Sequence, residues 1–267
     1  MKISVVQRRC GERTQEKHLD SYRDFQDVTI ASEGDLFSNT VKCLNDSLRK
    51  KCDWSLIINA DIRLYDNCIE YIINELKNVD TRSVYQVGFV VDDKFLGSPI
   101  FGVFAHNNKH IAKCSDWFIK KGEKGISAES NNIFNFMNNY NLKITHSNIV
   151  IGSHDFGQWY QDLYDKFLII GTRYRKQLNQ FIQHVNYRHI NFDNDFDVAV
   201  RALKDSEKLP KNFNVKRKIY NVYPILKSMG IEEKNSLLKN KCDSDNKACR
   251  YSDNCNFIDV TVRKNNF

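Results

Sequence analysis

The stretch Trp-Ser-Leu-Ile-Ile-Asn-Ala-Asp at residues 54–61 carries the clearest signal for the fold of this 267-residue chain. Its first part, Trp54–Ile58, is a nearly continuous apolar run, which is typical of a strand buried on both faces of a parallel sheet. The run stops at Asn59-Ala60-Asp61, where Asn and Asp favour a turn. A buried strand that ends in polar residues indicates an α/β sheet with functional groups at its carboxyl edge.

The segments on either side of this strand alternate between strand and helix patterns. The sequence predicts strands at residues 2–7, 28–31, 84–91, 100–105 and 142–151, and helices at 35–51, 67–77, 127–140, 156–170 and 172–187. The strands at 84–91 and 100–105 have a hairpin-like spacing. The alternation predicts an α/β fold with a Rossmann-like, mostly parallel sheet flanked by helices.

The charge divides the chain into two parts. Residues 1–170 hold 21 Lys and Arg against 22 Asp and Glu, a net charge of −1, whereas residues 171–267 hold 19 against 11, a net charge of +8. We therefore expect a catalytic domain at 1–170 and a helical, basic C-terminal extension at 171–267. A basic extension suits a polyanion such as nucleic acid or an acidic membrane surface, and a solvated face that aids solubility explains it equally well.

The sequence predicts a cytoplasmic protein with free thiols. Its N-terminal apolar stretch is too short for a secretory signal, and no run approaches the roughly 18 apolar residues of a membrane span. Without export, the scattered cysteines are expected to be free thiols: Cys10, Cys43, Cys52, Cys68 and Cys114.

Three further cysteines, Cys242, Cys249 and Cys255, cluster near the C-terminus. Their spacing matches no standard zinc knuckle, and no histidine lies among them. The sequence leaves open whether they bind a metal.

Polar residues follow three of the predicted strands, at the edge of the sheet where α/β proteins bind ligands. These residues are Gln7-Arg8-Arg9, Ser32-Glu33 and Asn59-Ala60-Asp61. No glycine-rich loop follows the first strand, which argues against a dinucleotide fold or P-loop. If phosphates bind at this edge, arginines or a metal ion must neutralise them.

The stretch Leu-Ile-Ile-Asn-Ala-Asp-Ile-Arg-Leu at residues 56–64 resembles the strand and D-x-D element of GT-A glycosyltransferases, closest to the family 2 type. The resemblance spans about residues 1–160 and includes the first strand, the second strand ending in Ala-Ser-Glu, and the helix before the motif. One departure is that Asn59 stands where the family has its first Asp. Asn is a neutral oxygen ligand, so the metal would depend mainly on Asp61.

The resemblance implies a sugar nucleotide, most simply a UDP-sugar, as donor. Mn²⁺ or Mg²⁺ would be held by Asp61 and Asn59 and would stabilise the charge that develops on the leaving diphosphate. The other residues that the resemblance and the strand ends place around the donor are Gln7, Arg8, Arg9, Glu33, Ala60 and Arg63. The alternative is that Asn59 and Asp61 only end a strand and form a turn.

A second polar segment, Ile-Val-Ile-Gly-Ser-His-Asp-Phe-Gly-Gln-Trp-Tyr-Gln-Asp at residues 149–162, resembles the acceptor-side element of the same family. Asp155 is the candidate general base, His154 could complete the metal shell, and Trp159 and Tyr160 could stack on an acceptor. The alternative is that Ser153 or Asp155 only caps a helix.

The remaining histidines give weaker signals. His106 and His110 flank Asn-Asn-Lys, which predicts a surface loop, and His184 and His189 lie in the basic, aromatic region. No Ser-His-Asp or Cys-His arrangement indicates a hydrolase.

The leading hypothesis is therefore a metal-dependent glycosyltransferase. Its acceptor is either a hydroxymethylated pyrimidine in bacteriophage DNA, in which case it would act in the host cytoplasm, or a saccharide or glycolipid reached by peripheral membrane contact. Arg173, Arg175 and Lys176 are the first candidate acceptor contacts, and Lys216, Arg217 and Lys218 form a second basic group. A catalytically inactive GT-A-like binding module and a nucleotidyltransferase remain as alternatives.

Overall fold

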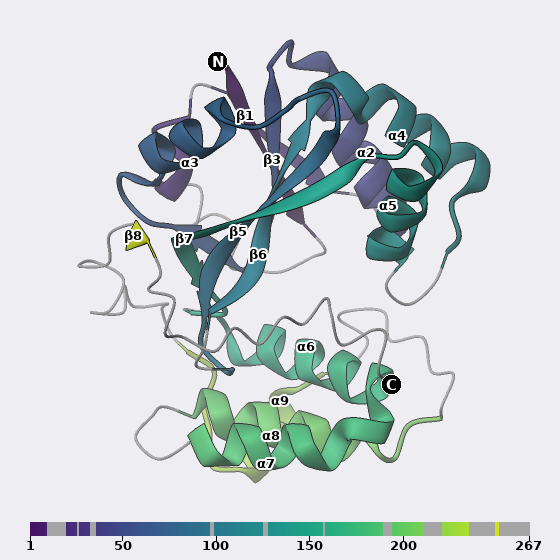
Figure 1. The fold of residues 1–267 in the computed structure, drawn as a ribbon. Coiled ribbons are helices and arrows are strands. Elements are labelled where there is room, and N and C mark those ends of the chain that lie inside the picture. Colours follow the sequence, from purple (N-terminus) through teal and green to yellow (C-terminus); the bar gives the residue numbers. More distant parts are fainter. Residues whose placement is uncertain are drawn as a thin grey trace.

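The apolar run at residues 54–58 forms β3 (Trp54–Asn59), a central strand of a curled sheet (Figure 1). The sheet has eight strands in the described residues, in the order β2-β1-β3-β6-β5-β7-β4, with β8 paired to β7. The computed structural model describes residues 1–9, 20–25, 27–32, 36–96, 99–124, 128–156, 158–188, 194–210, 221–234 and 249–250. The other strands are β1 (Ile3–Arg9), β2 (Val28–Ser32), β4 (Ile62–Leu64), β5 (Val84–Asp93), β6 (Pro99–Asn107), β7 (Lys143–His154) and β8 (Cys249–Arg250).

The predicted α/β class is confirmed, but the sheet is mixed rather than mostly parallel. β1 pairs in parallel with β2 and β3, and β5 pairs in parallel with β7. β6 is antiparallel to both β3 and β5, and β7 is antiparallel to β4 and β8. The cause lies in the short connection between β5 and β6, because a strand that returns after so few residues can only pair antiparallel.

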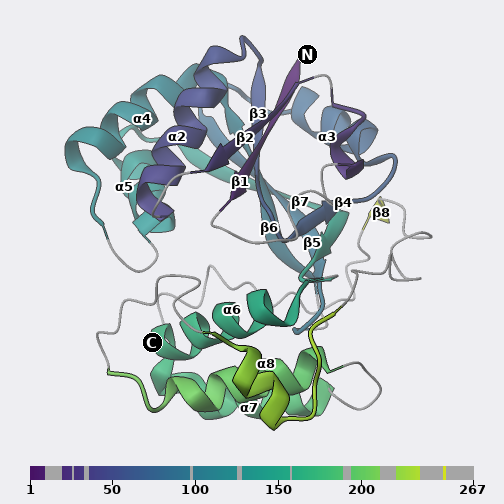
Figure 2. The same ribbon diagram turned by 180° about the vertical axis from the view of Figure 1, so that it is seen from behind.

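Helices cover both faces of this sheet (Figures 1 and 2). On one face, α2 (Leu36–Arg49), α4 (Asn108–Lys121) and α5 (Ala128–Asn139) pack against Val6 and Ile57. On the other face, α3 (Cys68–Lys77) packs against Leu56 and Ile58. Neighbouring residues of β3 point to opposite faces, so its apolar run serves both cores.

A second, helical lobe lies below the sheet lobe in Figure 1. It contains α6 (Tyr160–Arg173), α7 (Leu178–Arg188), α8 (Asp195–Ser206) and α9 (Tyr223–Ser228), whose buried residues form a core of their own. Among the buried residues that the structure describes, Phe95, which follows β5, is the one from the sheet lobe in that core. The predicted boundary between the two domains, after residue 170, lies within α6, whose buried residues belong to the helical core. That boundary stays a prediction.

Three α-helices of the described residues have no counterpart in the sequence prediction: α4, α8 and α9. In α4, Ile111, Cys114 and Phe118 are buried at helical spacing, and Asn107 caps the helix by accepting a hydrogen bond from the Lys109 N–H. The predicted surface loop at His106 is therefore wrong, because His106 lies in β6 and is only 2% exposed. None of the described helices is both long and apolar enough to cross a membrane.

Candidate functional site

Asp61 lies in the turn between β3 and β4, and the pairing of β4 with β7 brings it beside the second polar segment. Ile62 pairs with His154, and the Asp155 N–H donates to the Asp61 carbonyl oxygen at 3.1 Å. Asp155 adopts a left-handed backbone conformation, with φ of 68°, which Asp tolerates better than most residues. Two segments almost a hundred positions apart thus meet at one edge of the sheet.

The side chains at this edge form a compact ionic group, which we call the acidic cluster: Asp61, Asp93, His154, Asp155 and Lys166. The Lys166 ammonium is 2.8 Å from Asp61 Oδ2 and also bonds to Asp155 Oδ1. His154 Nε2 is 3.5 Å from Asp61 Oδ2. The cluster draws on both lobes, because Lys166 belongs to α6.

Asp93 orients the imidazole of His154. Asp93 pairs with His154 in the register of β5 and β7, and Asp93 Oδ2 is 2.7 Å from His154 Nδ1. The Leu96 N–H in turn donates to Asp93 Oδ1 at 2.7 Å. A carboxylate that binds one imidazole nitrogen while the other faces an ion is the usual support of a metal-bound histidine.

Opposite charges overcome the cost of burial for most of this cluster. Burial alone would raise the pKa of Asp61, but Lys166 and His154 hold that pKa well below its usual range. Burial alone would lower the pKa of His154, but the carboxylates of Asp155 and Asp61 raise it to about 10. For Asp155, burial outweighs the neighbouring cations and raises the pKa. Burial alone would lower the pKa of Lys166, but the same two carboxylates, Asp155 and Asp61, raise it.

The donor atoms of the acidic cluster fit a divalent cation. Ligand atoms of Asp61, His154 and Asp155 all lie within 4.8 Å of one another. Carboxylate oxygens suit Mn²⁺ and Mg²⁺, and imidazole is a common metal ligand. Asp61 Oδ1 is buried and has no hydrogen-bond partner, which is rare among buried polar atoms and is consistent with a place for an ion.

Asn59, the other predicted metal ligand, lies outside this set. Its side-chain oxygen accepts a hydrogen bond from Arg8 Nε at 2.9 Å. Arg8 is itself only 8% exposed and also forms an ion pair with Glu129 and a bond to Thr40. The oxygen that Asn59 would offer to a metal is therefore bonded to Arg8, and Arg8 ties the ends of β1 and β3 to α2 and α5.

The other residues predicted to contact the sugar-nucleotide donor lie in different local environments. Gln7 and Arg9 bond to each other, with Arg9 Nε 3.1 Å from Gln7 Oε1, while Gln7 Nε2 and Arg9 Nη2 are buried without a hydrogen-bond partner. Ala60 is buried, and its N–H donates to the Arg8 carbonyl oxygen. Arg63 is half-buried in β4, and Glu33 lies outside the described residues.

The predicted acceptor residues are spread along α6 and beyond it. Trp159 is half-buried just before the helix, and Tyr160 is buried in the helical core. Arg173 and Lys176 are exposed at the far end, whereas Arg175 donates to the carbonyl oxygens of Ser206 and Leu209. Helical rise alone separates Tyr160 from Arg173 by about 20 Å. His189 and the second predicted basic group, residues 216–218, lie outside the described residues, as do Cys242 and Cys255.

The alternative in which Ser153 or Asp155 caps this helix is wrong. The N–H groups of Tyr160 and Gln161 donate instead to the carboxylate of Glu233, at 2.9 and 3.1 Å. A carboxylate at a helix N-terminus satisfies free N–H groups and interacts favourably with the helix dipole. Ser153 and Asp155 lie in and directly after β7, before the helix begins.

Sequence reasoning missed Asp93 and Lys166. Asp93 ends a strand in the same way as Asn59, so the search of strand ends could have found it if β5 had been placed beside β7. Lys166 had no local signal, because a lysine in an amphipathic helix is usually a surface residue.

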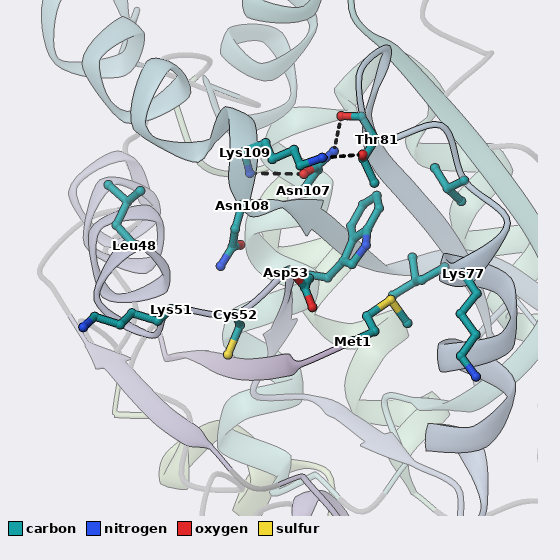
Figure 3. A pocket seen from close by; sticks show the side chains of 13 residues that line it. Met1, Leu48, Lys51, Cys52, Asp53, Lys77, Thr81, Asn107, Asn108 and Lys109 are labelled. Atoms are coloured by element: carbon teal, nitrogen blue, oxygen red, sulfur yellow. Dashed lines mark hydrogen bonds between the residues drawn. The ribbon is translucent and has the colours of Figure 1, made fainter.

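A surface pocket of about 570 Å³ lies at the opposite end of β3 (Figure 3). Its lining includes Met1, Asp53 and Trp54, and Lys109 bonds to Thr81 at its rim. Asp53 accepts a hydrogen bond from the Lys2 N–H. The acidic cluster is not part of this pocket, because β3 begins at Trp54 and ends before Asp61.

The sequence matches no known family profile and no curated protein. Among solved structures, the chain is similar to a glycosyltransferase involved in the glycosylation of the major capsid of PBCV-1, with a TM-score of 0.40 and 9% identity over 55% of this chain and 82% of that one. It is also similar to a mutant Drosophila β-1,4-galactosyltransferase 7 in complex with manganese, UDP-Gal and xylobiose, with a TM-score of 0.33 and 12% identity over 54% of this chain and 64% of that one.

A third similar structure is a glucose-1-phosphate thymidylyltransferase from Bacillus anthracis in complex with sucrose. Its TM-score is 0.30, with 13% identity over 68% of this chain and 74% of that one. Scores this low carry no argument about activity, so a function for this chain has to be argued from its own residues.

Proposed function

We propose that this chain is a glycosyltransferase that uses a divalent cation, Mn²⁺ or Mg²⁺, and a nucleotide-sugar donor. The observation that carries the proposal is the acidic cluster, in which Asp61, His154 and Asp155 meet at the carboxyl edge of an α/β sheet. Ligands of open α/β sheets bind at this edge. A bound divalent cation would stabilise the negative charge that develops on a leaving diphosphate.

Each residue of the acidic cluster named below would have its own role in binding the ion or in catalysis. Asp61, His154 and Asp155 would hold the ion, and Asp93 would keep His154 oriented through Nδ1. The sequence predicts Asp155 as the general base, and burial raises the pKa of its carboxyl group. Because Asp155 also lies among the ligand atoms, the base role and the ligand role are separate proposals for one carboxylate.

The donor would lie against the end of β1. Gln7 Nε2 and Arg9 Nη2 are buried donors without partners, and hydrogen-bond donors are what a base or a diphosphate requires. We favour a UDP-sugar as the donor. Arg8 would act indirectly, because its guanidinium is bonded within the protein and holds Asn59 in place.

For the acceptor we favour a hydroxymethylated pyrimidine in DNA over a saccharide or glycolipid. The exposed Arg173 and Lys176 would then bind phosphates, with steep salt dependence. Arg175 contributes less to this surface, because it bonds to backbone carbonyls. Reversing Arg173 and Lys176 to Glu should abolish duplex binding and spare hydrolysis of the sugar nucleotide. Absence of DNA binding at low salt would leave the saccharide acceptor ahead.

The decisive test measures hydrolysis and transfer from UDP-sugars with Mn²⁺ and with EDTA. The wild type should be active with Mn²⁺ and inactive with EDTA, and Asp61→Asn should be inactive in both. Asp205→Asn serves as the matched control, because Asp205 is also a partly buried, ion-paired carboxylate but belongs to the helical lobe. Binding of UDP-sugars without any turnover would favour the inactive binding module.

A further inference from the structure

The ammonium group of Lys166 lies where the candidate ligand atoms of the acidic cluster converge. Lys166 Nζ is 2.8 Å from Asp61 Oδ2 and 3.3 Å from His154 Nε2, and it also bonds to Asp155 Oδ1. These three residues are the ones whose ligand atoms can surround a metal ion. The side chain therefore occupies the position that the geometry offers to the ion.

The placement of Lys166 is built into the fold. Its side chain is 14% exposed, although lysines are rarely buried unless they are paired. It reaches the sheet lobe from α6, whose neighbouring residues Leu163 and Phe167 are buried in the helical core. The start of α6 is fixed by the carboxylate of Glu233. Helix and side chain together hold the ammonium against the end of β3.

We propose that Lys166 is an internal competitor of the divalent cation: it holds Asp61, His154 and Asp155 together, and the ion binds by displacing its ammonium group. The inference rests on the proposed function, because the ion is the one that a nucleotide-sugar donor would require. Two cations cannot share the same lone pairs, and their repulsion at a few ångströms is strong in a buried site. The free ion should therefore bind weakly, and a nucleoside diphosphate should strengthen its binding by adding negative charge.

The first test is a titration with Mn²⁺, followed by electron paramagnetic resonance and without any measurement of activity. Lys166→Met should bind Mn²⁺ at least about tenfold more tightly than the wild type, and Lys166→Arg should stay weak. Lys234→Met is the matched control, because Lys234 is another largely buried lysine but bonds to Asp195 and the Gln158 carbonyl oxygen. Equal or weaker binding by Lys166→Met, or no Mn²⁺ binding by any of these proteins, would overturn the proposal.

A second test uses the wild type alone and applies even if Lys166→Met fails to fold. Acetylation of lysines by acetic anhydride is quantified by mass spectrometry, without additions and with Mn²⁺ plus UDP. Labelling of Lys166 should rise several-fold when the ion binds, whereas labelling of Lys234 should not change. If Mn²⁺ binds and Lys166 stays protected, the competitor role is wrong, while Mn²⁺-dependent sugar transfer would leave the proposed function intact. Release of Lys166 by Mn²⁺ without any sugar transfer would support the competitor role and contradict the proposed function.

Discussion

Two buried ionic groups lie where the sheet lobe meets the helical lobe, and they differ in how many of their side chains are positive and how many are negative. The acidic cluster combines Asp61, Asp93 and Asp155 with His154 and Lys166. The second group, the lysine cluster, contains Lys94, Asp195 and Lys234, with the Asp195 side chain only 1% exposed. Lys94 bonds to one carboxylate oxygen of Asp195, and Lys234 bonds to the other.

The difference is that the carboxylate of one group is fully bonded within the protein and a carboxylate of the other is not. Both oxygens of Asp195 are bonded, so an added cation would have to break an existing pair. In the acidic cluster, Asp61 Oδ1 is buried without a partner, and carboxylates outnumber the basic side chains. A buried carboxylate with both oxygens bonded is consistent with a structural role, whereas a buried carboxylate oxygen without a partner is consistent with a site for an ion.

The largest expected effect comes from breaking the lysine cluster. Asp195→Ala leaves two buried ammonium groups without their shared carboxylate, so the free energy of unfolding should fall by about 3–5 kcal/mol. Urea denaturation measures this, with Asp116→Ala as the control, because Asp116 forms only an exposed pair with Lys120. A loss below about 1 kcal/mol would mean that the lysine cluster is not structural.

Breaking the acidic cluster should affect turnover more than stability. Asp61→Asn should lower the turnover of sugar-nucleotide hydrolysis at least about hundredfold, equivalent to about 2.7 kcal/mol. Its effect on unfolding should be smaller than that of Asp195→Ala, because Lys166 keeps its bond to Asp155. Steady-state kinetics and urea denaturation of the same preparation decide the matter. If stability falls as much as for Asp195→Ala, the two clusters do not differ in role.

His106 is a buried histidine for which no ion pair is seen among the described residues, in contrast to His154. Its pKa makes the free energy of unfolding depend on pH. Burial, helped by the charge of Arg8, lowers the pKa of His106 to about 3. The unfolded chain takes up this proton near pH 6.5, so the contribution of His106 to stability is full above that pH. It falls by about 1.4 kcal/mol per unit as the pH drops, or about 2 kcal/mol between pH 6.5 and 5.

His106→Gln is the matched variant for this prediction, because glutamine keeps a polar side chain but does not titrate. Urea denaturation at pH 6.5 and 5 should show a smaller loss for the variant than for the wild type. If the variant loses as much stability as the wild type between pH 6.5 and 5, other residues cause the acid sensitivity.

The smallest expected effect concerns the cap of α6, the helix that carries Lys166. Glu233→Ala removes the acceptor of two N–H groups and should lower the free energy of unfolding by about 1 kcal/mol. Because the helix start is loosened, acetylation of Lys166 should also rise. Glu207→Ala is the control, because Glu207 is an exposed residue at the end of α8. If neither the free energy of unfolding nor the acetylation of Lys166 changes, the cap by Glu233 does not help to hold Lys166 in the acidic cluster.

Local pattern was enough to predict the α/β class and most elements of the sheet lobe, because apolar runs such as residues 54–58 report burial directly. The strand end at Asp61, together with the resemblance to GT-A glycosyltransferases, also singled out Asp61, His154 and Asp155, which the structure brings together. Local pattern could not find Lys166 or Asp93, whose roles depend on strand order and on the docking of the helical lobe. The bonding of Asn59 to Arg8 was equally hidden, because it is a contact between two strand ends.

The cap of α6 also has a consequence for the order in which the protein is made. Glu233 is 73 positions further along the chain than the residue whose N–H it binds. During synthesis, all five residues of the acidic cluster leave the ribosome well before Glu233 does, and chains fold from the N-terminus as they emerge. For that interval the N–H groups of Tyr160 and Gln161 lack the carboxylate of Glu233 that binds them in the finished chain. The start of α6 therefore gains its carboxylate cap only after every residue of the acidic cluster has been made.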